Sequence, residues 1–183
     1  NSYLILDEKP TLIDTVKHYG ADEMLSRIKE IIDPAKIKYI ISNHTEMDHS
    51  GSIDALLKFC PDAEVVCSPK GEEGLRRHFK KDWKLKVVNT GDELEIGKRK
   101  LKFQLMPMVH WPDSMATYSE SDSILFPNDA FGQHYASEDR FADEVDHDVI
   151  YREAAKYYGN IVLPFGNQVL KVLESIKGLN IDM

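Results

Sequence analysis

One stretch of the sequence indicates the fold most directly, and its residues are Ser42-Asn43-His44-Thr45-Glu46-Met47-Asp48-His49-Ser50-Gly51. Two imidazoles and two carboxylates, which are common metal ligands, stand here at His44, Glu46, Asp48 and His49. In an extended chain alternate side chains lean to one side, so we expect the first three to face one way and His49 another. That division favours two metal ions over one.

The alternative for this stretch is a polar loop with solvated charges. It explains any single one of these side chains, but it accounts poorly for four candidate ligands within six residues. The stretch lies between a β-rich run, residues 38–42, and a helical pattern over residues 53–60, where loops commonly carry function. Ser50 is expected to cap the helix that follows.

Two later segments carry the same ligand types at the ends of predicted strands. His110 follows the strand expected at residues 101–106, and Asp129 follows the strand expected at residues 124–126. A layered fold brings strand ends together, so both side chains are expected beside the first loop. An aspartate has two oxygens and can bridge two ions, as two-metal sites require.

The remaining pattern predicts an α/β layered domain over residues 1–183, with helices packed outside β-sheets. Strands are predicted at residues 3–6, 11–16, 38–42, 64–67, 84–88, 94–96, 101–106, 116–119 and 124–126. Helices are predicted at residues 24–32, 53–60, 69–79, 145–161 and 169–176, with Pro164 interrupting the pattern before the last one.

Composition excludes several classes of function. The chain has 183 residues and a net charge of -8, and an acidic chain without a basic run is a poor candidate for binding nucleic acid or an anionic membrane. No apolar run approaches the roughly 18 residues of a membrane span. Cys60 and Cys67 are interpreted as structural residues of a protein from a reducing compartment. His18, His78 and His147 are expected at the surface.

The three motifs together resemble those of a known fold. The segments 44–49, 110–115 and 128–134 look like the ligand motifs of the metallo-β-lactamase fold. The usual zinc hydrolases of that superfamily carry a histidine where this chain has Glu46. The glutamate form is similar to the flavodiiron proteins, which are cytoplasmic reductases of dioxygen or nitric oxide. The resemblance covers the chain from Asn1 to Met183.

This resemblance implies an αββα sandwich holding two iron ions. The first iron would be held by His44, Glu46 and His110, the second by Asp48 and His49, and Asp129 would bridge them. The family completes the second iron with a further histidine, and no histidine follows His147 here. We therefore expect this chain to be part of a longer protein, cut at both ends.

The chemistry of Glu46 supports iron independently. Replacing an imidazole with a carboxylate adds a hard anionic oxygen, which suits iron cycling between its +2 and +3 states more than redox-inactive zinc. Glu46, Asp48 and Asp129 together bring three negative charges to the site.

The resemblance also implies cofactors and partners that lie outside this chain. Dioxygen or nitric oxide would be the substrate, and FMN on a flavodoxin-like domain would supply electrons. A head-to-tail homodimer would place each flavin beside the irons of the other subunit. The external donor would be rubredoxin or a reduced flavin or deazaflavin system.

Several interpretations remain open at this point. Trp111 and Met115 would meet the flavin of the partner subunit or fill space. His134 is either a donor behind the site or a surface residue, and Tyr157 matches a pocket tyrosine of the family or packs in the core. A dinuclear zinc hydrolase is the rival function, and a degenerate metal-binding scaffold is the non-enzymatic alternative.

Overall fold

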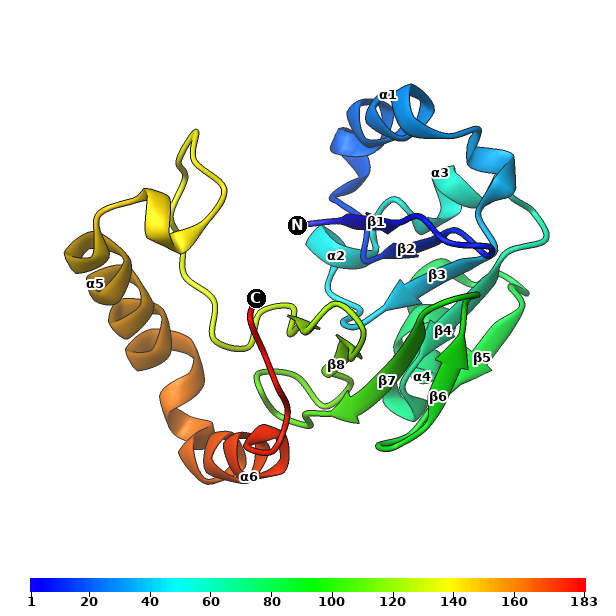
Figure 1. The fold of residues 1–183 in the computed structure, drawn as a ribbon. Helices are drawn as coiled ribbons and strands as arrows, with labels where there is room; N and C mark the ends of the chain where they lie inside the picture. The colour runs from blue at the N-terminus through cyan, green and yellow to red at the C-terminus, as the bar shows by residue number, and fades with distance from the viewer.

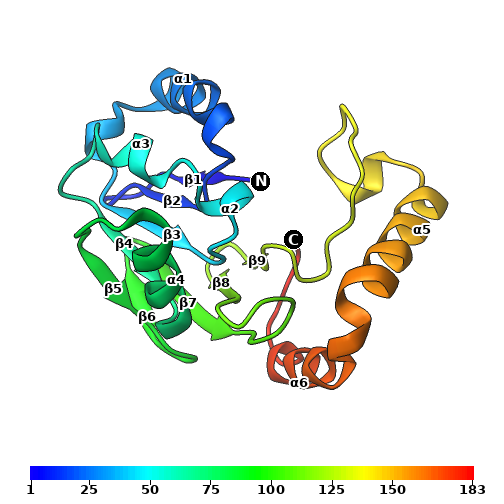
Figure 2. The same cartoon turned by 180° about the vertical axis from the view of Figure 1, so that it is seen from behind.

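Two β-sheets pack face to face in a computed structural model that describes all residues, 1–183 (Figures 1 and 2). The first sheet has its strands in sequence order and contains β1 (Tyr3–Ile5), β2 (Thr11–Ile13), β3 (Tyr39–Ser42), β4 (Glu64–Cys67) and β5 (Leu85–Val87). The second contains β6 (Glu93–Glu95), β7 (Lys100–Leu105), β8 (Met115–Ser119) and β9 (Ile124–Phe126). Strands β2 to β5 run parallel, and the second sheet is antiparallel.

Helices lie on the outer sides of the two sheets. They are α1 (Ala21–Ile31), α2 (Met47–Ser50), α3 (Ile53–Leu57), α4 (Pro69–Phe79), α5 (His147–Tyr157) and α6 (Gly166–Ile176). Short 3-10 turns occupy His18–Gly20, Pro34–Lys36, Ala142–Glu144 and Leu163–Phe165, and a π-helical turn spans Tyr158–Val162. Figure 2 shows α4 lying across the first sheet, and both views place α5 and α6 on the opposite side of the molecule from α1.

The parallel strands of the first sheet send successive side chains to opposite faces of the sheet. Side chains with period two point to opposite faces, so Ile40 and Ile41 enter different cores although both are fully buried. Ile40 packs with residues of α1, α3 and α4, such as Leu25 and Leu56. Ile41 packs between the sheets. Strands buried on both faces are expected to be mainly apolar. The centres of β3 and β4 fit this, with Ile40-Ile41 and Val65-Val66 all fully buried.

A third cluster joins the second sheet to the α5–α6 corner. Ala116 of β8 and Val109 pack with Tyr157, Val162 and Val169. Figure 1 shows α5 standing off from the two sheets, while α6 approaches the end of the second sheet. The order of layers is therefore helices, first sheet, second sheet and helices, so the predicted αββα fold class is correct.

Most predicted elements are present, but the structure differs at Pro164. The predicted break is a change of helix type: α5 passes into the π-helical turn, and the 3-10 turn Leu163–Phe165 carries Pro164 near its start. Proline is tolerated there because the first residues of a helix have no intrahelical partner for their N–H groups. The last helix therefore begins at Gly166, earlier than residue 169.

The expectations for the loop after β3 were wrong in two respects. Residues 47–50 form the helical turn α2, so Asp48 does not continue an extended chain. Ser50 lies inside that turn and caps nothing, because its hydroxyl donates to the carbonyl of Thr45 at 2.8 Å. No helix has the length and apolar character needed to cross a membrane.

Candidate metal centre

Three loops carry the six predicted ligand residues to one place. His44 and Glu46 follow the carboxyl end of β3, and Asp48 and His49 lie in α2. His110 lies in the connection from β7 to β8, and Asp129 follows β9. Strands β7 and β9 flank β8 in sheet order, so the ends that carry His110 and Asp129 are close. The backbone of Asn43 accepts a hydrogen bond from Met115 at 2.9 Å and ties the first loop to β8.

A first cluster of ligand atoms is formed by His44, Glu46, His110 and Asp129. Each residue contributes one atom, and these atoms all lie within 4.8 Å of one another. His44 Nε2 lies 3.3 Å from Glu46 Oε2, and His110 Nε2 lies 3.4 Å from Asp129 Oδ2. A metal with bonds of about 2.1 Å keeps tetrahedral ligand atoms about 3.4 Å apart. The spacing of the first cluster fits a metal ion.

A second cluster is formed by Asp48, His49 and the other oxygen of Asp129. His49 Nε2 lies 3.0 Å from Asp129 Oδ1 and 3.4 Å from Asp48 Oδ2. Despite these short distances, neither His49 Nε2 nor the buried Asp48 Oδ1 has a partner in hydrogen-bond geometry. Buried polar atoms usually have partners, so this pair of orphaned ligand atoms fits a cation between them. Asp129 thus offers one oxygen to each cluster.

Burial of the clusters is uneven. The side chain of His44 is 0% exposed, whereas those of Glu46 and Asp48 are 40% and 41% exposed. The imidazoles therefore form the closed side, and the two carboxylates face solvent. An ion held here would have protein on one side and room for a small ligand on the other.

Asp113 holds His44 in position, and the sequence analysis assigned it no role. Its Oδ2 lies 3.1 Å from His44 Nδ1 and accepts the backbone N–H of Thr45 at 2.7 Å. An ionised carboxylate only accepts, so His44 Nδ1 carries the proton and Nε2 is left free to bind a metal. Burial opposes the ionisation of Asp113, but its contacts with His44 and Thr45 outweigh burial and lower the pKa of Asp113. An acidic residue three positions after His110 was the available signal.

A buried polar network holds the second cluster. The carboxylate of Asp14 accepts from the backbone N–H of Asn43 at 2.8 Å and from the Asn128 amide at 2.9 Å. The same amide nitrogen lies 3.0 Å from His49 Nδ1. Thr15 donates both its N–H and its hydroxyl to the carbonyl of His49 at 2.7 Å. Sequence reasoning missed Asp14 and Asn128, because only the tertiary structure brings their loops together.

The carboxylates and imidazoles perturb one another strongly. Burial disfavours the charged form of His44, but Asp113, Asp129 and Glu46 outweigh it and raise the pKa. The pKa of His49 is also raised, against burial, chiefly by Asp129. Burial raises the pKa of Asp129, but His49, His44 and His110 lower it by more, so this pKa lies below its usual value. Without a metal, the raised pKa values favour the protonated forms of His44 and His49.

The three residues whose roles the sequence left open have different surroundings. Trp111 contacts His44 edge to face, with ring centroids 5.1 Å apart. His134 is exposed, and its ring meets that of Tyr157 edge to face at 5.0 Å. Tyr157 is buried in the third core, and burial followed by the carboxylates of the metal centre raises its pKa. His18, His78 and His147 are exposed.

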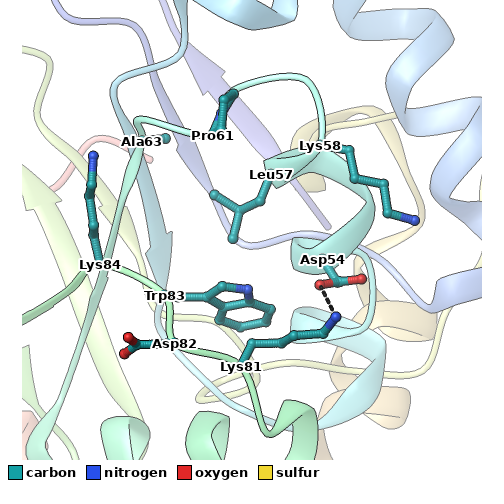
Figure 3. Close-up of a pocket in the computed structure, with 9 residues that line it drawn as sticks. All are labelled: Asp54, Leu57, Lys58, Pro61, Ala63, Lys81, Asp82, Trp83 and Lys84. Atoms are coloured by element: carbon teal, nitrogen blue, oxygen red, sulfur yellow. Dashed lines mark ion pairs between the residues drawn. The ribbon is translucent and has the colours of Figure 1, made fainter.

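A cavity of about 350 Å³ lies at the other end of the first sheet, next to Ala63 and Lys84, which directly precede β4 and β5 (Figure 3). The ring of Trp83 forms one wall, and Lys81 pairs with Asp54 across it at 3.9 Å. No histidine lines it. It is a poor place for redox or metal chemistry.

A basic segment, residues 76–86, adjoins this cavity. The sequence analysis expected a chain without a basic run, and that expectation was wrong for this segment. Six lysines and arginines lie there: Arg76, Arg77, Lys80, Lys81, Lys84 and Lys86. Acidic partners lie within 4.0 Å of four of them, through the pairs Arg76–Glu72, Arg77–Glu73, Lys81–Asp54 and Lys84–Asp62. The segment is largely neutralised and offers little net charge to a polyanion.

Comparison with known proteins places the chain in a family. A family model described as "ODP family beta lactamase" matches residues 1–183. The chain belongs to the ODP beta-lactamase family. Its fold is that of the metallo-β-lactamase-like cores of flavodiiron proteins. The resemblance inferred from the three motifs is thereby confirmed at the level of family and fold.

Three relatives illustrate the similarity of this ODP-family chain to known proteins. A protein named nitric oxide reductase from Moorella thermoacetica is 46% identical over 99% of the chain. The rubredoxin oxygen:oxidoreductase of Desulfovibrio gigas superposes with a TM-score of 0.95 at 41% identity over 97% of the chain. The flavodiiron protein of Giardia intestinalis superposes with a TM-score of 0.95 at 42% identity over 99%.

The ODP-family chain spans less than half of each of these proteins. It covers 46% of the nitric oxide reductase, 45% of the oxygen oxidoreductase and 44% of the Giardia protein. The similarity therefore concerns one region of larger proteins.

Proposed function

We propose that this domain holds two iron ions and reduces dioxygen to water, nitric oxide to nitrous oxide, or both. The observation that carries the proposal is the pair of ligand clusters that share the two oxygens of Asp129. The names of the relatives, a nitric oxide reductase and an oxygen oxidoreductase, support this choice of substrates.

The donor set fits iron. His44, Glu46 and His110 would hold one ion and Asp48 and His49 the other, with Asp129 between them. When bound, the iron ions would supply reducing electrons and open positions for the gas. Glu46 and Asp48 would balance the positive charge of the oxidised state, and their exposed sides leave a path for a small molecule.

The proposal includes an electron supply from outside this chain. Complete reduction of dioxygen takes four electrons and two ferrous ions supply two, so FMN on a flavodoxin-like domain is proposed as the nearby donor. A head-to-tail homodimer would bring that flavin from the partner subunit to the exposed side of the site. Rubredoxin or a reduced flavin or deazaflavin would recharge it. Two free buried cysteines agree with a cytoplasmic location.

Metal analysis with gas-uptake measurements tests the proposal. Protein purified with its natural metals is expected to contain iron and to consume dioxygen or nitric oxide when supplied with reduced flavin. Zinc in place of iron, together with hydrolysis of an ester or thioester, would contradict the proposal and favour the zinc hydrolase.

The variant Glu46→His tests the role of the carboxylate. Exchanging an anionic oxygen for a nitrogen is expected to lower iron retention in favour of zinc and to abolish gas reduction. Glu95→His is the matched control, because Glu95 is a highly exposed residue of β6. Unchanged turnover in Glu46→His would refute the role assigned to this side chain.

A further inference from the structure

An apolar cavity lies beside the candidate metal centre, between the ligand loops and the α5–α6 corner. Its volume is about 240 Å³, and seven of its eight lining residues are hydrophobic, the eighth being Gly132. Val109, Tyr157, Val162 and Val169 form buried walls, each less than 10% exposed. Phe131 and Tyr158, which are 45% and 38% exposed, form the sides nearest solvent.

The cavity is joined to the metal centre through the chain itself. Val109 directly precedes His110, and Phe131 lies two residues after Asp129. Tyr157 also lies close enough to the metal centre for the carboxylates of Asp129, Glu46 and Asp48 to act on it. The wall of the hollow is therefore formed in part by the same backbone segments that carry His110 and Asp129.

The chemistry of the two neighbouring spaces is opposite. The metal centre contains three carboxylates, whereas the cavity is lined by no charged side chain. Apolar cavities of about 150 Å³ stay dry and take up xenon or benzene, because water finds too few hydrogen-bond partners in them. This cavity is large enough for a diatomic molecule, and its lining offers no charged partner to an ion.

The wall of the cavity contains the most irregular helix of the chain. Tyr158 and Val162, the two ends of the π-helical turn, both line the hollow. Such turns are rare and occur frequently at functional sites. Ala154, one turn earlier on α5, lines the same space with a methyl group.

We propose that this cavity is a docking site for a small uncharged apolar gas on its way to the metal centre. The inference rests on the proposed function for the identity of the gas, dioxygen or nitric oxide. Binding here would concentrate the substrate beside His110 and Asp129 without using the polar opening at Glu46 and Asp48.

Xenon is the probe, because it is an apolar atom that reports gas-accessible hollows without reacting. Crystals of the iron-loaded protein pressurised with xenon are expected to show a xenon atom between Val109 and Val162. Absence of xenon from this cavity, including the case in which another segment of the full-length protein fills it, would overturn the proposal. This measurement requires no variant.

A pair of variants on α5 tests the kinetic consequence. Ala154→Leu fills the cavity, and Ala155→Leu makes the same substitution on the exposed neighbouring position. In Ala154→Leu the KM for the gas is expected to rise about fourfold, the equivalent of losing the burial of one methyl-sized group. Iron content and kcat are expected to stay unchanged. Ala155→Leu is expected to match the parent protein.

Two results of the kinetic test would contradict the proposal: an unchanged KM in Ala154→Leu, or a loss of iron and kcat with the KM unaltered, which would show a structural role only. Failure of the proposed function is distinguishable. A protein that holds xenon in the cavity but reduces neither gas would refute the reductase, whereas turnover without xenon binding would refute the docking site alone.

Discussion

At the scale of single residues, the geometry of the metal centre depends on side chains that do not themselves face the ion. The carboxylate of Asp113 fixes both the ring of His44 and the backbone at Thr45. Such partners of metal-binding imidazoles set the tautomer and the ring orientation. Their loss is therefore felt as a change in metal affinity.

The variant Asp113→Asn tests this role. The amide removes the negative charge that keeps the proton on His44 Nδ1, and iron affinity is expected to fall roughly 10- to 100-fold. Iron release to a competing chelator measures it. Asp82→Asn is the control, because that side chain is fully exposed and distant from the metal centre. Equal iron affinity in the two variants would contradict the role of Asp113.

A second residue-scale prediction distinguishes Asp129 from His110. Asp129 offers Oδ1 to His49 and Oδ2 to His110, so Asp129→Ala is expected to lower the occupancy of both ions. His110 approaches only the first cluster, so His110→Ala is expected to weaken mainly one ion. The number of metal ions per chain, measured by elemental analysis, separates the two cases. Loss of a single ion in Asp129→Ala would refute a bridging role.

At the scale of elements, the loops of the metal centre are held in uncommon backbone conformations. Four non-glycine residues beside the ligands have positive φ, namely Asp14, Met108, Asn128 and Phe131. Such conformations persist only where the surroundings impose them, and they cluster at functional sites. The loop after β3 is held differently, by close packing of Thr45 against α4.

The variant Gly74→Ala tests this packing. A Cβ on Gly74 would lie 2.8 Å from the hydroxyl oxygen of Thr45, which is buried and rigid at χ1. Alanine normally favours a helix, but here overpacking is expected to lower the free energy of unfolding by about 1–3 kcal/mol and to weaken metal binding.

The matched control is Gly159→Ala. A Cβ there meets nothing within 4 Å, so no loss of stability or metal binding is expected. Urea unfolding and metal content are the measurements for both variants. A more stable Gly74→Ala protein with full metal content would contradict the close contact.

At the scale of the whole molecule, the charges of the metal centre make folding depend on pH in the metal-free protein. Folded-state pKa values above 6.5 at His44 and His49 stabilise the fold below pH 6.5, and this contribution is lost as the pH rises through the raised values. Folded-state pKa values below 3.8 at Asp113 and Asp129 stabilise it above pH 3.8 and are lost as the pH falls through the lowered values.

The chelator-treated protein is therefore expected to draw most stability from this centre between about pH 4 and about pH 6.5 and less near pH 9. Iron should reverse the trend, because a metal binds the deprotonated imidazoles. Urea midpoints across this range, with and without metal, measure both effects. His49→Gln should reduce the pH dependence of the metal-free protein, and an unaltered dependence in this variant would contradict the assignment.

Much of the architecture follows from the sequence. The strand–helix alternation from residues 38 to 79 predicts strands of a sheet covered by helices, because apolar runs and the Ser68-Pro69 start of α4 are local signals. The ligand types at residues 44–49 indicate metal chemistry, because few other roles need so many imidazoles and carboxylates together. These features depend on residues that are close together in the sequence, so the sequence alone determines them.

Only the tertiary structure decided how distant residues meet. The contact of Asp113 with His44 joins residues 69 positions apart, and that of Asp14 with Asn128 joins residues 114 positions apart. Asp129 is shared between His110, 19 positions away, and His49 in the loop after β3. The turn α2 stands in place of the expected extended chain. Thr15 holds it through the carbonyl of His49, and the hydroxyl of Ser50 ties it to the carbonyl of Thr45. Such contacts depend on how two sheets stack, and a linear pattern of residues does not record the register between layers.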